Sequence, residues 1–370
     1  MQSTHQVRYG TATAMNDIGD ESIDLVVTSP PYPMIEMWDE VFSQQREEVK
    51  DAISKGDGNR AFELMHGLLD RAWHEVYRVL KPGGFACINI GDATRTIEDH
   101  FRLYSNHARI LSRCLDIGFS NLPAIIWRKQ TNAPNKFMGS GMLPAGAYVT
   151  LEHEFILVLR KGEKRKCNTP AEKLHRLESA FFWEERNVWF SDVWWDLKGT
   201  GQVLNNKEAR QRSGAFPFEL PYRLINMYSM KGDTVLDPFL GTGTTTLAAI
   251  ASGRNSIGVE IDERLSGVVS TSLTHGIVDR SNERVQRRLS DHIAFVTERE
   301  RTHGPGCFKH RNKNYDFPVM TRQEVEIKIE FLKRVGREAG DTLIAEYAAD
   351  ARLDSMEVHS LFANPTVSTR

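Results

Sequence analysis

Two short loops carry residues whose types and spacing suit binding and catalysis. The first, LDPFLGTGTT at 236–245, follows an apolar run and precedes a helix-like one. Its glycines at 241 and 243 let the backbone approach a ligand, and amide groups at a helix start can hold an anionic or polar group. Glu260, 23 positions after Asp237, ends the next expected strand and can accept hydrogen bonds from a ribose diol. The pattern predicts a nucleoside-cofactor site.

The same loop argues against two phosphate-bearing cofactors. It lacks the third glycine of the dinucleotide fingerprint GxGxxG and the lysine of the nucleotide-binding loop GxxxxGK[ST]. NAD and ATP are therefore disfavoured. S-adenosyl-L-methionine, which has an adenosine but no phosphate, fits the pattern better.

The second loop, TSPPY at 28–32, follows the apolar run IDLVV. Two consecutive prolines fix their own φ angles and keep Ser29 out of the helical region, so the loop is stiff and its carbonyls point in set directions. One hydroxyl, fixed carbonyls and an aromatic plane can bind a flat group that carries an amine. Both loops follow strand carboxyl ends, where open α/β sheets bind ligands, so we expect one shared site.

Short Val- and Ile-rich runs that alternate with helical patterns predict an α/β protein with a mostly parallel sheet. Their near-continuous apolarity indicates that helices cover both faces of the sheet. A long helical stretch lies between Tyr32 and Lys81, and KPGG at 81–84 ends it. The expected strands are Ile23–Thr28, Phe85–Ile90, Leu122–Arg128, Phe155–Arg160, Thr234–Asp237 and Ser256–Ile261.

The composition of the 370 residues, 40% hydrophobic and 26% charged, indicates a soluble globular protein and excludes a disordered or disulfide-scaffold class. Four dispersed cysteines without a CxxC pair suit a reducing cytosol and predict no metal site. No signal-like segment opens the sequence, and no run approaches the roughly 18 apolar residues of a membrane span. The net charge of -2 hides a division, because residues 128–215 hold 15 basic and 10 acidic side chains, against 12 and 18 in residues 1–127.

TSPPY together with DPFLGTGTT resembles the catalytic and cofactor motifs of the amino-group DNA methyltransferases, which methylate cytosine N4 or adenine N6. Further similar stretches are EVYRVLKPGGFACINIGD (75–92), IIWRKQ (125–130), EHEFILVLRKG (152–162) and AFPFELPYRLINMYS (215–229), so the likeness spans about residues 7–262. TSPPY precedes the cofactor loop by about 200 residues. This order resembles the permuted, β-type arrangement, in which a recognition region separates the two halves.

The resemblance implies the S-adenosylmethionine-dependent methyltransferase fold, a seven-stranded, mostly parallel sheet with one antiparallel strand, for which EHEFILVLRK is the candidate. It implies a catalytic half at 1–162, a target-recognition region at 163–214, a cofactor-binding half at 215–264 and a C-terminal, mostly helical extension at 265–370. Within that extension, VEIKIEFLKRVGREAG and DTLIAEYAADARL have a helical appearance.

The resemblance also assigns site residues. Relatives usually have Gly-Asp after the first strand, whereas Thr11 follows Gly10 here and takes the place of one acidic adenosine contact. The catalytic residues it implies are Ser29, Pro30, Pro31 and Tyr32, and the cofactor-binding residues are Thr11, Phe216, Asp237, Pro238, Phe239, Gly241, Gly243, Thr244, Thr245 and Glu260.

An exocyclic amine is a poor nucleophile because its lone pair is delocalised into the ring. Our hypothesis is that Ser29 Oγ and the Pro30 carbonyl accept hydrogen bonds from the amine and stabilise the positive charge that develops on nitrogen. A base in a duplex cannot reach this loop, so the target would be flipped out and stacked on Tyr32. In the family, Ser at this position usually accompanies cytosine N4, and Asp or Asn accompanies adenine N6, which stays the alternative. C5 methylation is disfavoured because no cysteine follows a proline.

The basic excess in residues 128–215 predicts a surface for double-stranded DNA, because phosphate neutralisation needs local charge. A solvated surface is the alternative. Four tryptophans within 183–195 fit mainly the core of a small recognition subdomain, with base contact as the minority interpretation. The candidate DNA-binding residues are Lys129, Lys161, Lys164, Arg165, Lys166, Lys207, Arg210 and Arg212.

Two rival functions stay open from the sequence. Enzymes that methylate a protein glutamine or an RNA base use related two-proline loops, but they generally place the cofactor loop first. A non-catalytic DNA-binding subunit could keep the fold, although the residues for both loops are intact. The favoured function is a site-specific, base-flipping DNA methyltransferase of a prokaryotic restriction–modification system, cytoplasmic and nucleoid-associated, without membrane contact. A cognate restriction endonuclease acting on the same site is a candidate partner.

Overall fold

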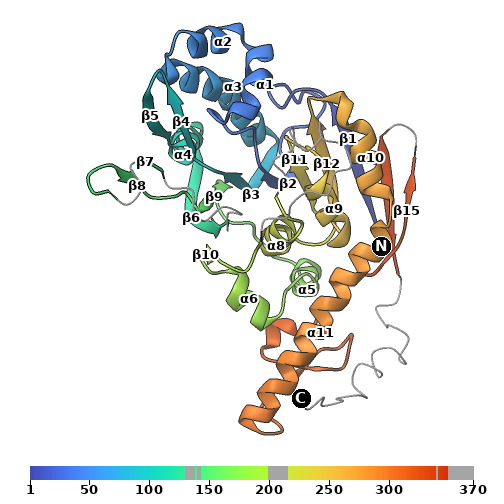
Figure 1. Ribbon diagram of the computed structural model, residues 1–370. Coiled ribbons are helices and arrows are strands. Elements are labelled where there is room, and N and C mark those ends of the chain that lie inside the picture. Colours follow the sequence, from blue (N-terminus) through green and yellow to red (C-terminus); the bar gives the residue numbers. More distant parts are fainter. Residues whose placement is uncertain (130–137, 140–142, 199–215, 339–340, 349–370) are drawn as a thin grey trace.

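The computed structural model describes residues 1–129, 138–139, 143–198, 216–338 and 341–348. In these residues a ten-stranded β-sheet forms the centre of the molecule, with helices on both faces (Figure 1). Its strands follow one another in space in the order β10 (Val193–Trp194), β6 (Phe119–Arg128), β9 (His153–Lys161), β3 (Leu80–Ile90), β2 (Ile23–Thr28), β11 (Thr234–Asp237), β12 (Asn255–Glu260), β1 (Gln2–Tyr9), β16 (Thr342–Tyr347) and β15 (Leu332–Arg337).

The predicted seven-stranded sheet is confirmed as the part from β6 to β1. Within it β9, the EHEFILVLRK strand, runs antiparallel to both of its neighbours, β3 and β6. The other neighbouring pairs from β3 to β1 are parallel. Two additions lengthen the sheet, because β10 pairs parallel with β6, and the β16–β15 hairpin pairs antiparallel with β1.

Helices cover both faces because the central strands are apolar on both sides. In β2, all six residues are buried, and Ile23 and Val26 belong to one core while Leu25 and Val27 belong to the other. The first core includes α1 (Asp39–Gln45), α2 (Glu47–Ser54), α3 (Gly58–Val79) and α4 (Asn106–Ile117). The second includes α8 (Glu219–Tyr228) and α9 (Thr244–Ala251).

Residues 163–198 are the described part of the predicted recognition region, and they pack onto the sheet. Helix α5 (Pro170–Glu178) starts with a capping box, and α6 (Trp183–Trp189) follows it. Trp189 and Trp194 are buried in the same core as α8, and Trp195 is 61% exposed. Trp189 and Trp194 therefore extend the core of the main sheet, which corrects the prediction that the tryptophans form mainly the core of a separate subdomain.

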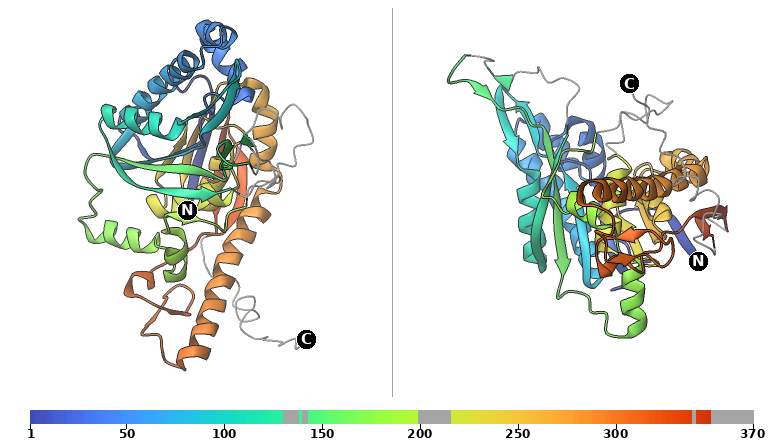
Figure 2. Two further views of the ribbon diagram at one scale, coloured as in Figure 1. Left: turned by 60° about the vertical axis from the view of Figure 1, so that its left-hand side comes forward. Right: turned by 90° about the horizontal axis from the view of Figure 1, so that it is seen from below.

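The C-terminal region is helical only in its first part. Helix α10 (Ser266–Thr274) leads into α11 (Ile277–His303), which extends from the sheet as a long arm (Figures 1 and 2). The two stretches expected to be helical further on contain β15 and β16 instead, so that expectation is wrong. In β16, Leu343, Ala345 and Tyr347 are buried and alternate with less buried residues. This period of two is that of a strand.

Shorter elements complete the described chain. Three small hairpins lie outside the main sheet, β4–β5 (Ala93–Ile97 with His100–Tyr104), β7–β8 (Met138–Gly139 with Ala147–Tyr148) and β13–β14 (His310–Arg311 with Pro318–Val319). Short 3-10 turns occur at Glu36–Trp38, Glu263–Leu265 and Arg322–Glu324. Among the helices described, none combines the length and the apolarity that crossing a membrane requires.

Candidate active site

The predicted cofactor loop forms a tight turn between β11 and α9. The strand ends at Asp237, and the turn passes through Gly241 and Gly243, whose φ angles of 55° and 86° lie in the left-handed region. Gly243 is also the residue that precedes the first turn of α9. The turn places the Gly241 amide over Glu260 at the end of β12, to which it donates a hydrogen bond of 2.7 Å.

Glu260 is buried beneath this turn. One carboxylate oxygen accepts from the Gly241 amide, and the other accepts from the Asp262 amide at 2.9 Å. Burial raises the pKa of Glu260, although these two hydrogen bonds act in the opposite direction. Each oxygen keeps a further acceptor position, so the group suits the two hydroxyls of a ribose.

Asp237 connects the cofactor loop to the TSPPY loop. Its carboxylate accepts hydrogen bonds of 2.6 Å from both the Thr28 and the Thr245 hydroxyls, and one of 3.1 Å from the Phe239 amide. Burial raises the pKa of Asp237 to about 6, against the effect of these bonds. Because Thr28 starts the TSPPY loop and Thr245 lies in α9, Asp237 fixes the position of one loop relative to the other.

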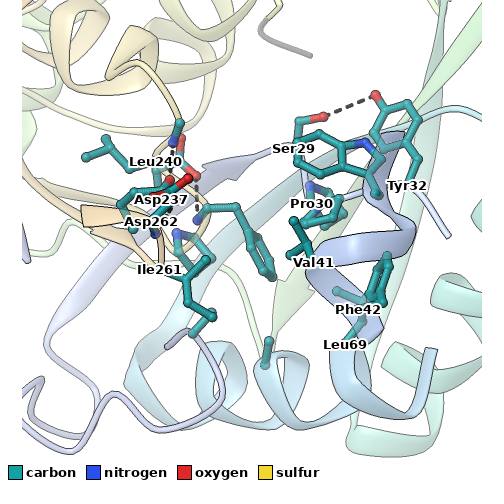
Figure 3. Close-up of a pocket in the computed structure, with 18 of the residues that line it drawn as sticks. Ser29, Pro30, Tyr32, Val41, Phe42, Leu69, Asp237, Leu240, Ile261 and Asp262 are labelled. Carbon is teal, nitrogen blue, oxygen red and sulfur yellow. Dashed lines mark hydrogen bonds between the residues drawn. The ribbon is translucent and has the colours of Figure 1, made fainter. Parts of the chain in front are cut away.

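A chain of hydrogen bonds leads from the TSPPY loop to a buried acid. Ser29 Oγ donates to the Tyr32 hydroxyl at 3.1 Å, and this hydroxyl donates to Glu154 Oε2 at 2.9 Å (Figure 3 shows the first contact). The Asn89 amide donates to both oxygens, at 2.8 Å to Tyr32 and 2.7 Å to Glu154. Lys129 Nζ lies 2.8 Å from Glu154 Oε1. Burial, and next the charge of Glu154, raise the pKa of Tyr32 well above its usual value.

One cavity of about 350 Å³ takes in both loops. In Figure 3, Asp237, Leu240, Ile261 and Asp262 lie on one side of it, and Ser29, Pro30 and Tyr32 lie on the other. The predicted site residues that line it are Thr11, Ser29, Pro30, Pro31, Tyr32, Phe216, Asp237, Pro238, Phe239, Gly241, Thr244 and Glu260. The expectation that the two loops share one site is therefore realised in the geometry.

Two predicted cofactor residues have supporting positions instead. Thr245 is 1% exposed and bonds to Asp237, and Gly243 shapes the turn. Thr11, which stands where relatives have an acid, lies at the cavity wall, and its hydroxyl pairs with that of Thr13. The neighbouring Gly10 amide donates to the Glu260 carbonyl at 2.8 Å, so the end of β1 is fixed beside Glu260.

The predicted DNA-binding residues that the structure describes do not gather on one surface, because they lie at both ends of the parallel strands. Lys129 lines the cavity. Lys161 is almost buried, with its ammonium bonded to the Tyr77 carbonyl and 3.2 Å from Glu21, and Arg165 pairs with Asp233 at the amino end of β11. Lys164 and Lys166 are exposed beside Arg165. Lys207, Arg210 and Arg212 lie outside the described residues.

Several cavity residues escaped the sequence reasoning. Trp38, Val41 and Phe42, on the segment between the TSPPY loop and α2, and Leu69 in α3 line the cavity. Glu154 also lines the cavity, and the signal in the sequence is that it is the single acid within a strand otherwise rich in apolar residues. In the described ranges, no group of three or more His, Cys, Asp or Glu side chains is placed to hold a metal ion.

A seven-stranded sheet with one reversed strand, with a cavity beside an acid at the end of β12, is the arrangement of the S-adenosylmethionine-dependent methyltransferases. The family model for DNA methylases, the N6/N4 methyltransferases, matches residues 23–268. The type II methyltransferase M.MthZI of Methanothermobacter thermautotrophicus is 52% identical over 330 residues, which cover 89% of this chain and 91% of that protein. M.MjaI of Methanocaldococcus jannaschii is 49% identical over 286 residues, covering 73% and 91%.

Solved structures agree with this. A putative DNA modification methylase of Thermus thermophilus, crystallised with S-adenosyl-L-methionine, is 32% identical with a TM-score of 0.57, over 74% of this chain and 96% of that one. The cytosine-N4-specific PvuII DNA methyltransferase, 19% identical with a TM-score of 0.54 over 76% and 92%, supports the fold alone. The chain belongs to the DNA methylase family, whose methyl donor is S-adenosyl-L-methionine. The predictions of family, fold and cofactor are confirmed.

Proposed function

We propose that the protein methylates the N4 amine of a cytosine within a specific site of double-stranded DNA. The observation that carries this proposal is that Ser29 lines the same cavity as Glu260 and the cofactor loop. A serine at this position, where relatives that act on adenine N6 usually have Asp or Asn, favours cytosine N4. The similar proteins from the two archaea are named type II methyltransferases, which supports DNA as the substrate.

The chain's own groups account for the activation of the amine. When bound, S-adenosyl-L-methionine supplies an electrophilic methyl group. Ser29 donates its own hydrogen to Tyr32, so the lone pairs of Ser29 Oγ stay available to accept from the amine. The Pro30 carbonyl accepts the second amine hydrogen, and the nitrogen lone pair is thereby directed at the methyl group. Much of the rate gain comes from holding the two in near-attack contact.

The target base must leave the duplex to reach this cavity. The Tyr32 hydroxyl is held by Glu154 and Asn89, which fixes the plane of the ring before a base arrives. The flipped cytosine stacks on that ring. Lys129, at the cavity wall, is the predicted basic residue best placed near the flipped nucleotide. Residues 163–214 contribute target recognition between the catalytic half (1–162) and the cofactor-binding half (215–264).

The biological setting follows from the relatives. Type II methyltransferases protect DNA sites from a cognate endonuclease, and we infer a restriction–modification role with such an endonuclease acting on the same site. The protein would then work on the nucleoid in the cytoplasm of a prokaryote.

The test is methyl transfer to DNA, followed by nucleoside mass spectrometry and sequencing of the modified positions. We expect N4-methylcytosine from the native protein. Ser29→Ala should lower the methyl-transfer rate by about 10²-fold, because one acceptor of the developing cation is lost, with unchanged cofactor affinity. Ser112→Ala, at an exposed position of α4, is the matched control.

Three results would contradict the proposal in different ways. N6-methyladenine without N4-methylcytosine would overturn the base assignment and leave the family intact. Full activity of Ser29→Ala would remove the role given to its hydroxyl. A native protein that binds S-adenosyl-L-methionine but methylates no DNA would favour the non-catalytic subunit.

A further inference from the structure

We propose that Glu154 is the final acceptor of the proton that the target amine releases, and that Ser29 and Tyr32 pass it there. The inference rests on the proposed function, because it concerns the proton that leaves the amine in the same reaction. Methylation of a neutral amine produces a cationic nitrogen that must lose a proton. A proton acceptor linked to the methylation site is therefore useful to the enzyme.

The hydrogen bonds already run in the required direction. Ser29 Oγ donates to the Tyr32 hydroxyl at 3.1 Å, and the Tyr32 hydroxyl donates to Glu154 Oε2 at 2.9 Å. Each donor could pass its hydrogen to the next oxygen and take one from the previous group, without any side-chain movement. The chain begins at the residue that faces the amine and ends at a carboxylate that is only 8% exposed.

The neighbours of Glu154 favour this role. Lys129 Nζ, 2.8 Å from Oε1, holds the carboxylate in place beside the relay. Asn89, on β3, donates to both Tyr32 and Glu154 and so holds the two relay oxygens together. Because the pKa of Tyr32 is raised well above its usual value, its phenol stays neutral and conducts the proton without becoming a stable phenolate.

The atoms and electrons of the step balance. The carbon–nitrogen bond forms while the carbon–sulfur bond of the methyl donor breaks, and the sulfur keeps that electron pair. As the carbon–nitrogen bond forms, the nitrogen gives its proton to Ser29 Oγ, the Ser29 hydrogen moves to Tyr32, and the Tyr32 hydrogen moves to Glu154, so the rate of methyl transfer depends on the relay. Glu154 becomes a neutral carboxylic acid, which afterwards loses its proton to solvent, while Lys129 keeps its charge throughout.

A purely structural Glu154, which only orients Tyr32, is the alternative, and Glu154→Gln separates the two. Glutamine keeps the shape and can still accept from Tyr32, but it cannot take up a proton. We expect the single-turnover rate of methyl transfer to fall by about 10²-fold. The affinities for S-adenosyl-L-methionine and DNA should stay unchanged, as should the fluorescence of 2-aminopurine placed at the target position.

Tyr32→Phe tests the middle of the relay, because it keeps the ring and removes only the hydroxyl. It should give the same loss as Glu154→Gln, and the double variant should lose no more. In mixtures of H2O and D2O, a plot of the native single-turnover rate against the deuterium fraction should be curved, because several protons move in the same step. That curvature should disappear in both variants.

The matched control is Glu152→Gln, two residues before Glu154, where the carboxylate pairs with Arg128 at 3.1 Å outside the relay. It should retain the native rate. A native rate in Glu154→Gln or Tyr32→Phe would overturn the relay, as would losses confined to affinity or to base flipping. These outcomes all presuppose an active native protein, whereas its failure to methylate DNA would contradict the proposed function itself.

Discussion

The parallel strands of the sheet begin at one side, here called the amino edge, and end at the other, here called the carboxyl edge. Acidic residues have different partners at these two edges. At the amino edge, Asp24 accepts from Lys81 Nζ at 2.8 Å, and both oxygens of Asp233 accept from Arg165. At the carboxyl edge, Asp237 and Glu260 accept from hydroxyls and backbone amides, and burial raises the pKa of both. Cations pair with Asp24 and Asp233 at the amino edge, whereas Asp237 and Glu260 at the carboxyl edge line a cavity.

The contrast changes how the basic residues of the chain are interpreted. Lys129 and Arg165 belong to the same positively charged stretch of sequence, but the antiparallel strand β9 and the loop that follows it carry the chain from the carboxyl edge to the amino edge. Lys129 therefore reaches the cavity, and Arg165 completes an ion pair away from it. A local excess of charge indicates a nucleic-acid surface only when the fold gathers the charges at one edge.

The largest effect is expected at Glu260. Glu260→Ala removes the predicted ribose acceptor and the anchor of two backbone amides, and hydrogen bonds to a charged group contribute about 1.5–3 kcal/mol each. We expect the dissociation constant of S-adenosyl-L-methionine to rise by about 10²-fold or more, measured by isothermal titration calorimetry. The control is Glu263→Ala, at an exposed position three residues later. If the dissociation constant of Glu260→Ala for S-adenosyl-L-methionine stayed within threefold of the native value, Glu260 would not bind the cofactor. The proposed difference between the two edges would then be wrong for Glu260.

The next effect concerns the pH dependence of stability at Asp237. Its pKa of about 6 in the folded state exceeds the ordinary value of 3.8, so the folded protein holds more protons than the unfolded chain between these pH values. The contribution of Asp237 to stability therefore falls as the pH rises through this window and is lost above pH 6. Between about pH 4.5 and 7 the native free energy of unfolding should fall by about 2 kcal/mol relative to Asp237→Asn.

Urea unfolding at several pH values measures this difference. Asparagine can keep the bonds to Thr28 and Thr245, because hydroxyls both donate and accept. Asp116→Asn, at an exposed position of α4, should show no such relative change. If the free energy of unfolding depended on pH in the same way for the native protein and Asp237→Asn, the pKa of Asp237 would not be raised. The proposed difference between the two edges would then be wrong for Asp237.

The smallest effect is expected at the amino edge. Arg165 is 45% exposed in its side chain, and exposed ion pairs contribute about 1 kcal/mol or less. Arg165→Ala should lower the free energy of unfolding by at most about that amount, without changing DNA affinity or its salt dependence. Lys164→Ala is the exposed neighbour for comparison. A tenfold loss of DNA affinity in Arg165→Ala alone would place a DNA contact at this edge.

The sequence predicted the central strands and the two loops correctly, because short stretches of neighbouring residues determine them. The bounds of β2 and β11 agree with the predicted strands, because continuous apolar runs ended by turn residues leave little freedom. The cavity followed from two loops at strand carboxyl ends. The helical expectation at β16 failed because its Ala and Glu residues are good helix formers, whereas the alternating burial comes from pairing with β1.

Glu154 was missed for a related reason. Its meaning depends on Tyr32, 122 positions earlier, and on Asn89, 65 positions earlier, which only the folded sheet brings to it. The spacing of these residues along the sequence does not predict that they are in contact. Trp189 and Trp194 are core residues, as predicted, but the core to which they belong is set by α8 and the sheet.

The sheet order has a consequence for how the molecule is made. Strand β2 pairs with β11, about 210 residues later, and β1 pairs with β12 and β16, about 250 and 340 residues later. Contacts so distant along the chain form slowly, and a nascent chain emerges from its N-terminus. The TSPPY loop therefore leaves the ribosome long before its partners, and the cofactor cavity is among the last parts of the protein to be completed during translation.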